Sequence, residues 1–226
     1  MLFDLINYGD FRIAMIVFLL TVPSMLIALT FHEVAHGFVA YKCGDPTAKY
    51  MGRLTLNPIK HLDPIGTLLM LVVGYGWARP VPVNSRYFKK PRRDMALTAL
   101  AGPVTNLLLG FVGVVLYCLV AYYNGAEILL GTATPLVQAC YLFTYYFAML
   151  NLVFAVFNMI PLPPFDGSRI FLVFLPPKYY FGIMKYERYI LLGMLVLMYV
   201  LPWSPINLIA DFIFAQMANL VGLILF

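Results

Sequence analysis

Charged residues are scarce in this sequence: Asp, Glu, Lys and Arg make up 11% of its 226 residues, against roughly 25% in ordinary soluble domains. Hydrophobic residues make up 62%. This scarcity of charge argues against a soluble domain and indicates a protein embedded in a lipid bilayer. The chain also has no linker, internal repeat or low-complexity tract, so we expect residues 1–226 to form a single transmembrane domain.

Cysteine is also rare, and the start of the chain has little positive charge. Cys43, Cys118 and Cys140 are scattered without any Cys-x-x-Cys spacing, which argues against a disulfide framework and against a thiolate metal site. Residues 1–12 contain no lysine, and no small-residue cleavage signal follows the first apolar run. We therefore expect no removed signal peptide, and the first apolar run should stay in the membrane.

Long apolar runs fill the rest of the sequence, and a bilayer crossing takes about 20 such residues. We expect five crossings, at residues 13–43, 95–123, 134–160, 188–202 and 206–226. Residues 65–77 are apolar but too few to cross, which predicts a re-entrant element between the first two crossings. Residues 53–57 and 79–84 have period-two patterns bounded by Gly and Pro, which predicts a small β-hairpin. The predicted fold class is an all-α polytopic membrane protein with this one short re-entrant or β-hairpin element.

The basic residues lie in two groups between the apolar runs. Ten of the fifteen fall between Lys42 and Arg93 and four between Arg169 and Arg188, while residues 124–133 have none. The positive-inside rule places both groups in the cytoplasm and the N-terminus outside. Because these residues follow the apolar runs and do not line an amphipathic face, the net charge of +5 does not indicate nucleic-acid binding.

Residues that could bind a metal stand inside the first apolar run, in HEVAH. His32 and His36 are four residues apart, so on a helix they lie on one face one turn apart, with Glu33 beside them. Two imidazoles at this spacing can bind one Zn²⁺, and the glutamate is placed to take a proton from a water that the ion activates. Each of these side chains costs a few kcal/mol at membrane depth, which favours a function over coincidence.

A hydrolytic zinc site usually has three protein ligands, so a third must be found. Asp166 follows the third crossing, where prolines break the helix and allow the carboxylate to turn inward. The charge pattern places HEVAH and Asp166 at similar depth near the cytoplasmic face. His61 also lies in a cytoplasmic loop and stays open as a ligand or gate, although its turn-forming neighbours favour a capping or loop-stapling role.

Two motifs together resemble a known family. HEVAH at the end of an apolar run and NMIPLPPFDG at Asn158–Gly167 are similar to the site-2 protease family of intramembrane zinc metalloproteases (peptidase family M50), most closely its small members without PDZ or CBS domains. Residues 52–67 and 99–106 also resemble segments of that subgroup. The resemblance implies a membrane enzyme, in a prokaryotic cell membrane, that hydrolyses a peptide bond in or near a transmembrane segment of a substrate protein.

The resemblance also assigns roles to residues. It implies that His32, His36 and Asp166 bind one Zn²⁺ per chain, that Glu33 is the catalytic general base, and that Asn158 helps to hold the substrate or the oxyanion. Asn106, which follows a Gly-Pro break, either satisfies a neighbouring helix or touches the site; the structural role is favoured because intramembrane amides commonly link helices.

Two other functions stay open at this point. A metal transporter could use the same His and Asp residues, although it would leave Glu33 without a task. A catalytically inactive membrane-binding relative is the second alternative, although such a protein would be free to lose the base. The expected partners are the lipid bilayer and a transmembrane protein substrate, while the sequence specifies neither the substrate nor the oligomeric state.

Overall fold

The protein is mostly helical in the residues that the computed structural model describes, which are 11–73, 76–175, 177–200 and 205–225. Four long helices carry most of the chain: α2 (Phe11–Lys42), α5 (Pro91–Leu129), α6 (Pro135–Asn158) and α10 (Pro205–Leu225). The shorter helices are α3 (Thr47–Tyr50), α4 (Pro64–Val73), α7 (Asp166–Phe171), α8 (Pro177–Met184) and α9 (Glu187–Val200), with 3-10 turns at Pro58–His61, Ser85–Tyr87 and Leu172–Phe174. The predicted all-α class is confirmed.

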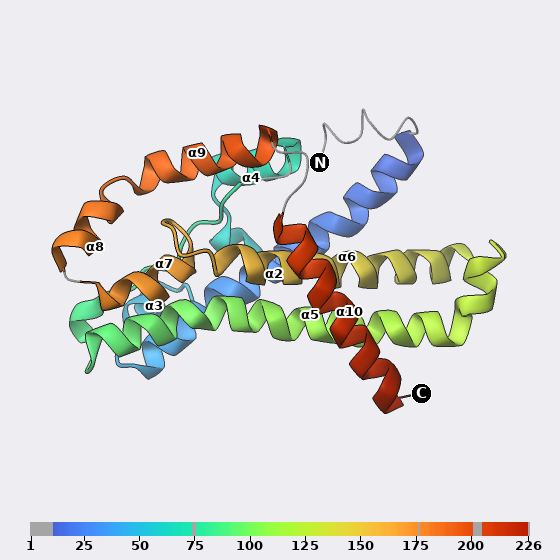
Figure 1. Ribbon diagram of the computed structural model, residues 1–226, viewed down its shortest axis with the longest axis horizontal. Helices are drawn as coiled ribbons and strands as arrows, with labels where there is room; N and C mark the ends of the chain where they lie inside the picture. The colour runs from blue at the N-terminus through green and yellow to red at the C-terminus, as the bar shows by residue number, and fades with distance from the viewer. Residues whose placement is uncertain (1–10, 74–75, 176, 201–204, 226) are drawn as a thin grey trace.

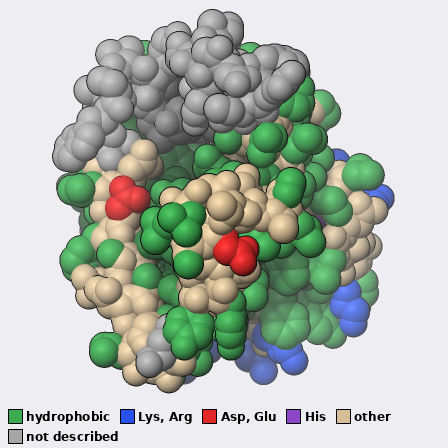
Figure 2. Space-filling view, turned by 90° about the vertical axis from the view of Figure 1, so that its right-hand side faces the viewer, with side chains coloured by type: hydrophobic (Ala, Val, Ile, Leu, Met, Phe, Trp, Pro, Cys, Tyr) green, Lys and Arg blue, Asp and Glu red, His purple; other side chains and the backbone are tan. Residues whose placement is uncertain are grey.

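The four long helices make the chain an integral membrane protein. The segments Met15–Lys42, Pro91–Leu129, Pro135–Asn158 and Pro205–Leu225 are each long and apolar enough to cross a bilayer. Many of their large hydrophobic side chains point outward, and Figure 2 shows such side chains over much of one face. Exposed apolar surface of this extent is suited to lipid and not to water.

α5 and α6 form a long antiparallel pair against which α2 and α10 pack (Figure 1). Glycines on α5 allow the two helices to approach closely, as is common between membrane helices. A Cβ added to Gly113 would lie 2.9 Å from Ala148 of α6, and one added to Gly110 would lie 2.7 Å from Leu152. Larger residues at these positions would push α5 away from α6.

The expected number of crossings is only partly matched. Four of the five predicted segments coincide with the long helices. The other, 188–202, falls on α9, which has 14 residues and is therefore about 21 Å long, short of the roughly 30 Å hydrocarbon core; residues 201 and 202 lie outside the described part. The predicted re-entrant segment, 65–77, is largely α4, and its depth in the bilayer stays a prediction.

The predicted β-hairpin at 53–57 and 79–84 is wrong. Among the described residues there is no strand, and between the two predicted arms there is only an isolated antiparallel bridge, which joins Leu62 and Ala78 just outside them. Beside this bridge the Arg79 N–H donates to the carbonyl of His61 over 2.9 Å. The period-two pattern therefore marks extended chain without a ladder.

Side chains, not a partner strand, hold residues 79–84. The Val81 N–H donates to the carboxylate of Glu33, and the Asn84 N–H donates to Asp45. The Arg53 guanidinium donates to the carbonyl of Arg79 over 2.7 Å. Pro80 and Pro82 have no N–H to offer a ladder. Of the N–H groups that a hairpin could use at 79–84, those of residues 80 and 82 are therefore absent, and those of Arg79, Val81 and Asn84 are already bonded.

Candidate metal centre and active site

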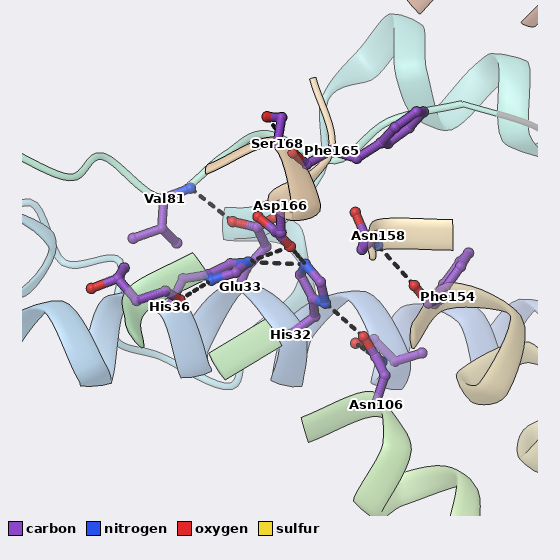
Figure 3. Close-up of polar contacts among 12 residues, drawn as sticks. His32, Glu33, His36, Val81, Asn106, Phe154, Asn158, Phe165, Asp166 and Ser168 are labelled. Atoms are coloured by element: carbon purple, nitrogen blue, oxygen red, sulfur yellow. Dashed lines mark hydrogen bonds and ion pairs between the residues drawn. The ribbon is translucent and has the colours of Figure 1, made fainter. Parts of the chain in front are cut away.

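Three side chains from two distant parts of the chain meet at one point (Figure 3). His32 and His36 project from α2, and Asp166 is the first residue of α7. The two Nε2 atoms are 3.0 Å apart, and each lies 3.1 Å from Oδ2 of Asp166. Within the described part of the chain, these residues form the one group of three or more His, Cys, Asp or Glu residues with ligand atoms all within 4.8 Å of one another.

The spacing of these atoms suits a zinc ion. Tetrahedral ligands at about 2.0–2.1 Å from zinc lie roughly 3.3 Å from one another, close to the separations of 3.0 and 3.1 Å here. Oδ2 of Asp166 is buried and has no hydrogen-bond partner, although two ring nitrogens face it. The two Nε2 atoms and this oxygen point lone pairs at one another, and a cation bound among them would accept all three.

α5 holds both imidazoles from behind. Nδ1 of His36 donates to the carbonyl of Thr98 over 2.7 Å, so the Nε2 of the neutral ring presents a lone pair to the cluster. Nδ1 of His32 lies 2.6 Å from Oδ1 of Asn106. Gly102 leaves the space in which the rings sit, since a Cβ there would be 2.5 Å from atoms of both.

Asp166 is presented by a tight return of the chain after α6. A Cβ on Gly167 would lie 2.4 Å from the carbonyl oxygen of Met159 and 2.5 Å from that of Ile160, so only glycine allows this approach. The hydroxyl of Ser168 donates to the carbonyl of Phe165 over 2.7 Å and closes the turn.

Glu33 lies on the same turn of α2 as the two histidines. It is buried, and its Oε2 accepts a hydrogen bond from the Val81 N–H over 2.8 Å. Val81 stands between Pro80 and Pro82, so its amide is the only N–H in that tripeptide. Oε1 of Glu33 has no hydrogen-bond partner among the described residues, which leaves it available to a small molecule at the site.

Asp45 fixes the far end of the segment that meets Glu33. Its side chain is fully buried. Oδ2 accepts from the Asn84 N–H over 2.6 Å, and Oδ1 accepts from the Thr47 N–H over 3.0 Å. The sequence does not predict a role for Asp45 or Val81 near the site. Its one sign of the role of Asp45 in holding a turn is the sequence Asp-Pro-Thr shortly after α2.

The remaining predicted residues fall in three different places. Asn158 ends α6 beside the site, and its Nδ2 donates to the carbonyl of Phe154 over 3.0 Å (Figure 3). His61 is fully buried outside the ligand cluster, and its Nε2 lies 2.8 Å from the carbonyl oxygen of Thr55. Asn106 links three helices and also contacts His32, so the two roles weighed for it coincide.

Comparison with known proteins agrees with this chemistry. The model of peptidase family M50 matches residues 20–201. YwhC of Bacillus subtilis, named as a candidate zinc metalloprotease, is 51% identical over 78% of this chain and 78% of its own length. Rip2 of Mycobacterium tuberculosis, a further candidate zinc metalloprotease, is 27% identical over 80% of this chain and 67% of its own length. MJ0611 of Methanocaldococcus jannaschii, named in the same way, is 29% identical over 73% of this chain and 74% of its own length. No solved structure matches.

Proposed function

Since the chain belongs to peptidase family M50, we propose that it is an intramembrane zinc metalloprotease that hydrolyses a peptide bond in or near a transmembrane segment of another protein. One observation carries the proposal. His32, His36 and Asp166 converge within a membrane-embedded bundle, and Glu33 stands on the same helical turn as the two histidines. The relatives named as candidate zinc metalloproteases support the zinc-dependent proteolysis in this proposal.

His32, His36 and Asp166 would hold one zinc ion per chain. When bound, zinc supplies a Lewis acid that polarises a carbonyl and lowers the pKa of water to about 7. Two imidazoles and one carboxylate are ligands that suit zinc better than the hard ions Mg²⁺ and Ca²⁺. They also leave the fourth position that a hydrolytic site needs.

Glu33 is the proposed general base. The Val81 N–H holds Oε2, so the carboxylate cannot turn freely, and Oε1 can accept the proton of the attacking water. The same oxygen can then pass that proton to the leaving amine. Because Glu33 is buried, no bulk water competes for the proton during the transfer.

Asn158 is proposed to bind the carbonyl oxygen of the scissile bond. Its Nδ2 now donates to Phe154 of its own helix. Substrate binding would exchange that backbone carbonyl for the substrate's, which needs only a side-chain rotation. A helical substrate engages its own carbonyls, so it must unwind locally before it reaches Asn158 and Glu33.

The proposed topology has the N-terminus outside and the site nearer the cytoplasmic face. HEVAH lies shortly before Lys42, at the basic end of α2, where the path for water is short. We retain five crossings, with the short α9 as the additional one, and a re-entrant α4. The chain would act as one domain whose partners are the bilayer and the transmembrane substrate.

The test compares Glu33→Gln with the wild type in cells and as purified full-length protein. The amide of this variant would keep an oxygen for the Val81 N–H but could not take a proton, so zinc content should stay and cleavage should be lost. Membrane proteomics should then find a spanning protein that accumulates uncut. Glu127→Gln is the matched control, because Glu127 is exposed on α5 and its loss should leave cleavage intact.

The two alternative functions give other outcomes in the same experiment. A metal transporter would still carry zinc into vesicles when Glu33 is replaced, and no substrate would accumulate. An inactive binding protein would lose nothing on replacement of Glu33. Either result would refute the proposed protease.

A further inference from the structure

We infer that Asn151 of α6 is a positioning residue for the metal, because, together with the carbonyl of Ala28, it determines through Asn106 which ring nitrogen of His32 carries the proton. Asn151 does not belong to the ligand cluster. The inference rests on the proposed function, since it concerns how the same site is prepared for zinc. It assigns a role to a residue that the metal-binding motifs do not contain.

The argument starts at a backbone carbonyl. The side chain of Asn151 bonds to the carbonyl oxygen of Phe147, one turn earlier on α6, over 2.8 Å. A carbonyl can only accept, so the amide nitrogen of Asn151 must face it. The side-chain oxygen of Asn151 is then directed to the other side, toward α5.

The oxygen of Asn151 orients the side-chain amide of Asn106, which in turn faces His32. Its Nδ2 donates to Oδ1 of Asn151 over 3.0 Å and to the carbonyl of Ala28 on α2 over 3.2 Å. Both donors of the amide are thereby used. Its Oδ1 faces Nδ1 of His32 at 2.6 Å.

The polarity fixes the tautomer of His32. Because Oδ1 of Asn106 can only accept, the proton of the neutral imidazole must sit on Nδ1. Nε2, which lies 3.1 Å from Oδ2 of Asp166, then carries the lone pair that a metal requires. A chain of three hydrogen bonds thus runs from α6 through α5 to the ligand on α2.

Burial leaves two groups, the carbonyl of Ala28 and Oδ1 of Asn151, to orient the Asn106 amide that faces His32. Asn106 and Asn151 have no exposed surface, so water cannot replace a lost donor or acceptor. Turning either amide over would oppose two oxygens or two N–H groups in the core of the bundle. His36 differs, because its Nδ1 bonds directly to the carbonyl of Thr98 and needs no relay.

The test measures the zinc affinity of the purified full-length protein by competition with a chelator. Asn151→Leu removes one of the two acceptors that orient the Asn106 amide, so the amide turns over more easily and the tautomer of His32 is less firmly fixed. Zinc affinity should fall about 10-fold, as for other partners of metal ligands. Asn151→Asp should keep near-normal affinity, because a carboxyl group accepts from Asn106 whether or not it is ionised. If Asn151→Leu does not fold, Asn151→Thr can bond back to Phe147 and still removes the amide oxygen that accepts from Asn106.

Thr144→Val is the matched control. Thr144 is buried on the same helix, and its hydroxyl bonds back to the carbonyls of Cys140 and Tyr141 without crossing to another helix. Its replacement loosens α6 in a similar way and should leave zinc affinity unchanged. An equal fall in affinity for Thr144→Val and Asn151→Leu would overturn the inference.

Nitrogen NMR of the histidine rings in the metal-free protein reads the tautomer directly. The chain has only three histidines, so their signals can be assigned by substitution. His32 should be protonated on Nδ1 in the wild type and should show both tautomers in Asn151→Leu. An unchanged tautomer or an unchanged zinc affinity would refute the relay, whereas a wild-type protein that neither binds zinc nor cleaves would refute the proposed function instead.

Discussion

Replacing Gly102 by alanine tests the packing that holds both imidazoles. The added Cβ would lie 2.5 Å from Cε1 of His32, 2.5 Å from Nε2 of His36 and 2.6 Å from Cε1 of His36. Ordinary contact begins at 3.4 Å, so the rings and α5 must separate by about 0.9 Å. Neither ring can yield easily, because Nδ1 of each is bonded to α5 itself.

The displacement is large compared with what a metal site tolerates. Ligand distances in such sites vary by about 0.2 Å, and a misplacement on the order of 1 Å costs about 100-fold in activity. A 100-fold loss of activity corresponds to about 2.7 kcal/mol of transition-state stabilisation. Helix propensity works in the other direction, because alanine favours a helix over glycine by roughly 1 kcal/mol.

The assay compares Gly102→Ala with Gly125→Ala, which lies on the same helix but has nothing within 4 Å of its added Cβ. Zinc affinity, cleavage and helix content are measured on both purified proteins. Gly102→Ala should lose zinc and cleavage and keep its helices, while Gly125→Ala should behave like the wild type. Normal zinc affinity in Gly102→Ala would refute the packing argument.

Three further predictions concern the surroundings of the site. Asp45→Ala releases the Asn84 N–H and with it the segment that meets Glu33, so cleavage should fall while bound zinc stays. The lost bonds to a buried carboxylate should lower the free energy of unfolding by roughly 2 kcal/mol in a denaturation curve. Equal losses of zinc and cleavage would contradict this role. Gly167→Ala drives a Cβ into two backbone carbonyls and should displace Asp166 enough to abolish zinc binding, whereas retained zinc would show that the turn can adapt. Removing the metal with a chelator should abolish cleavage, zinc should restore it and magnesium should not; activity that survives full metal removal would exclude the proposed chemistry.

The central part of the site could be predicted from the sequence because helix geometry determines it. A spacing of four residues puts His32 and His36 on one face of any helix, and the apolar run guarantees the helix. Asp166 needed a topological argument, since it lies far from HEVAH in sequence. The charge pattern places the two segments at the same depth, and the structure brings their ligand atoms within 3.1 Å.

The supporting contacts could not be predicted, because they join side chains to backbone groups distant in sequence. Nothing in the residue type of Val81 marks its N–H as the partner of Glu33. The Gly102-Pro103 pair suggests a break, yet α5 continues through Pro103. Proline is tolerated inside membrane helices when neighbouring helices satisfy the freed carbonyl.

The wrong β-hairpin has a related cause. Alternation of residue types reports which side chains share a face, but it does not report whether backbone partners are available. At 79–84 two prolines remove donors, and Glu33 and Asp45 occupy two of the others. The same amino acids that gave the segment its strand-like pattern also exclude it from a ladder.

The hydrogen bond to Glu33 comes from the main-chain N–H of residue 81, so the bond itself does not depend on the chemistry of the side chain at that position. The side chain of Val81 is buried, so its exchange would act on packing and not on the hydrogen bond itself. Only a third consecutive proline would remove the amide hydrogen. What the chain must keep at this position is a peptide N–H and a side chain of a size that the core accepts.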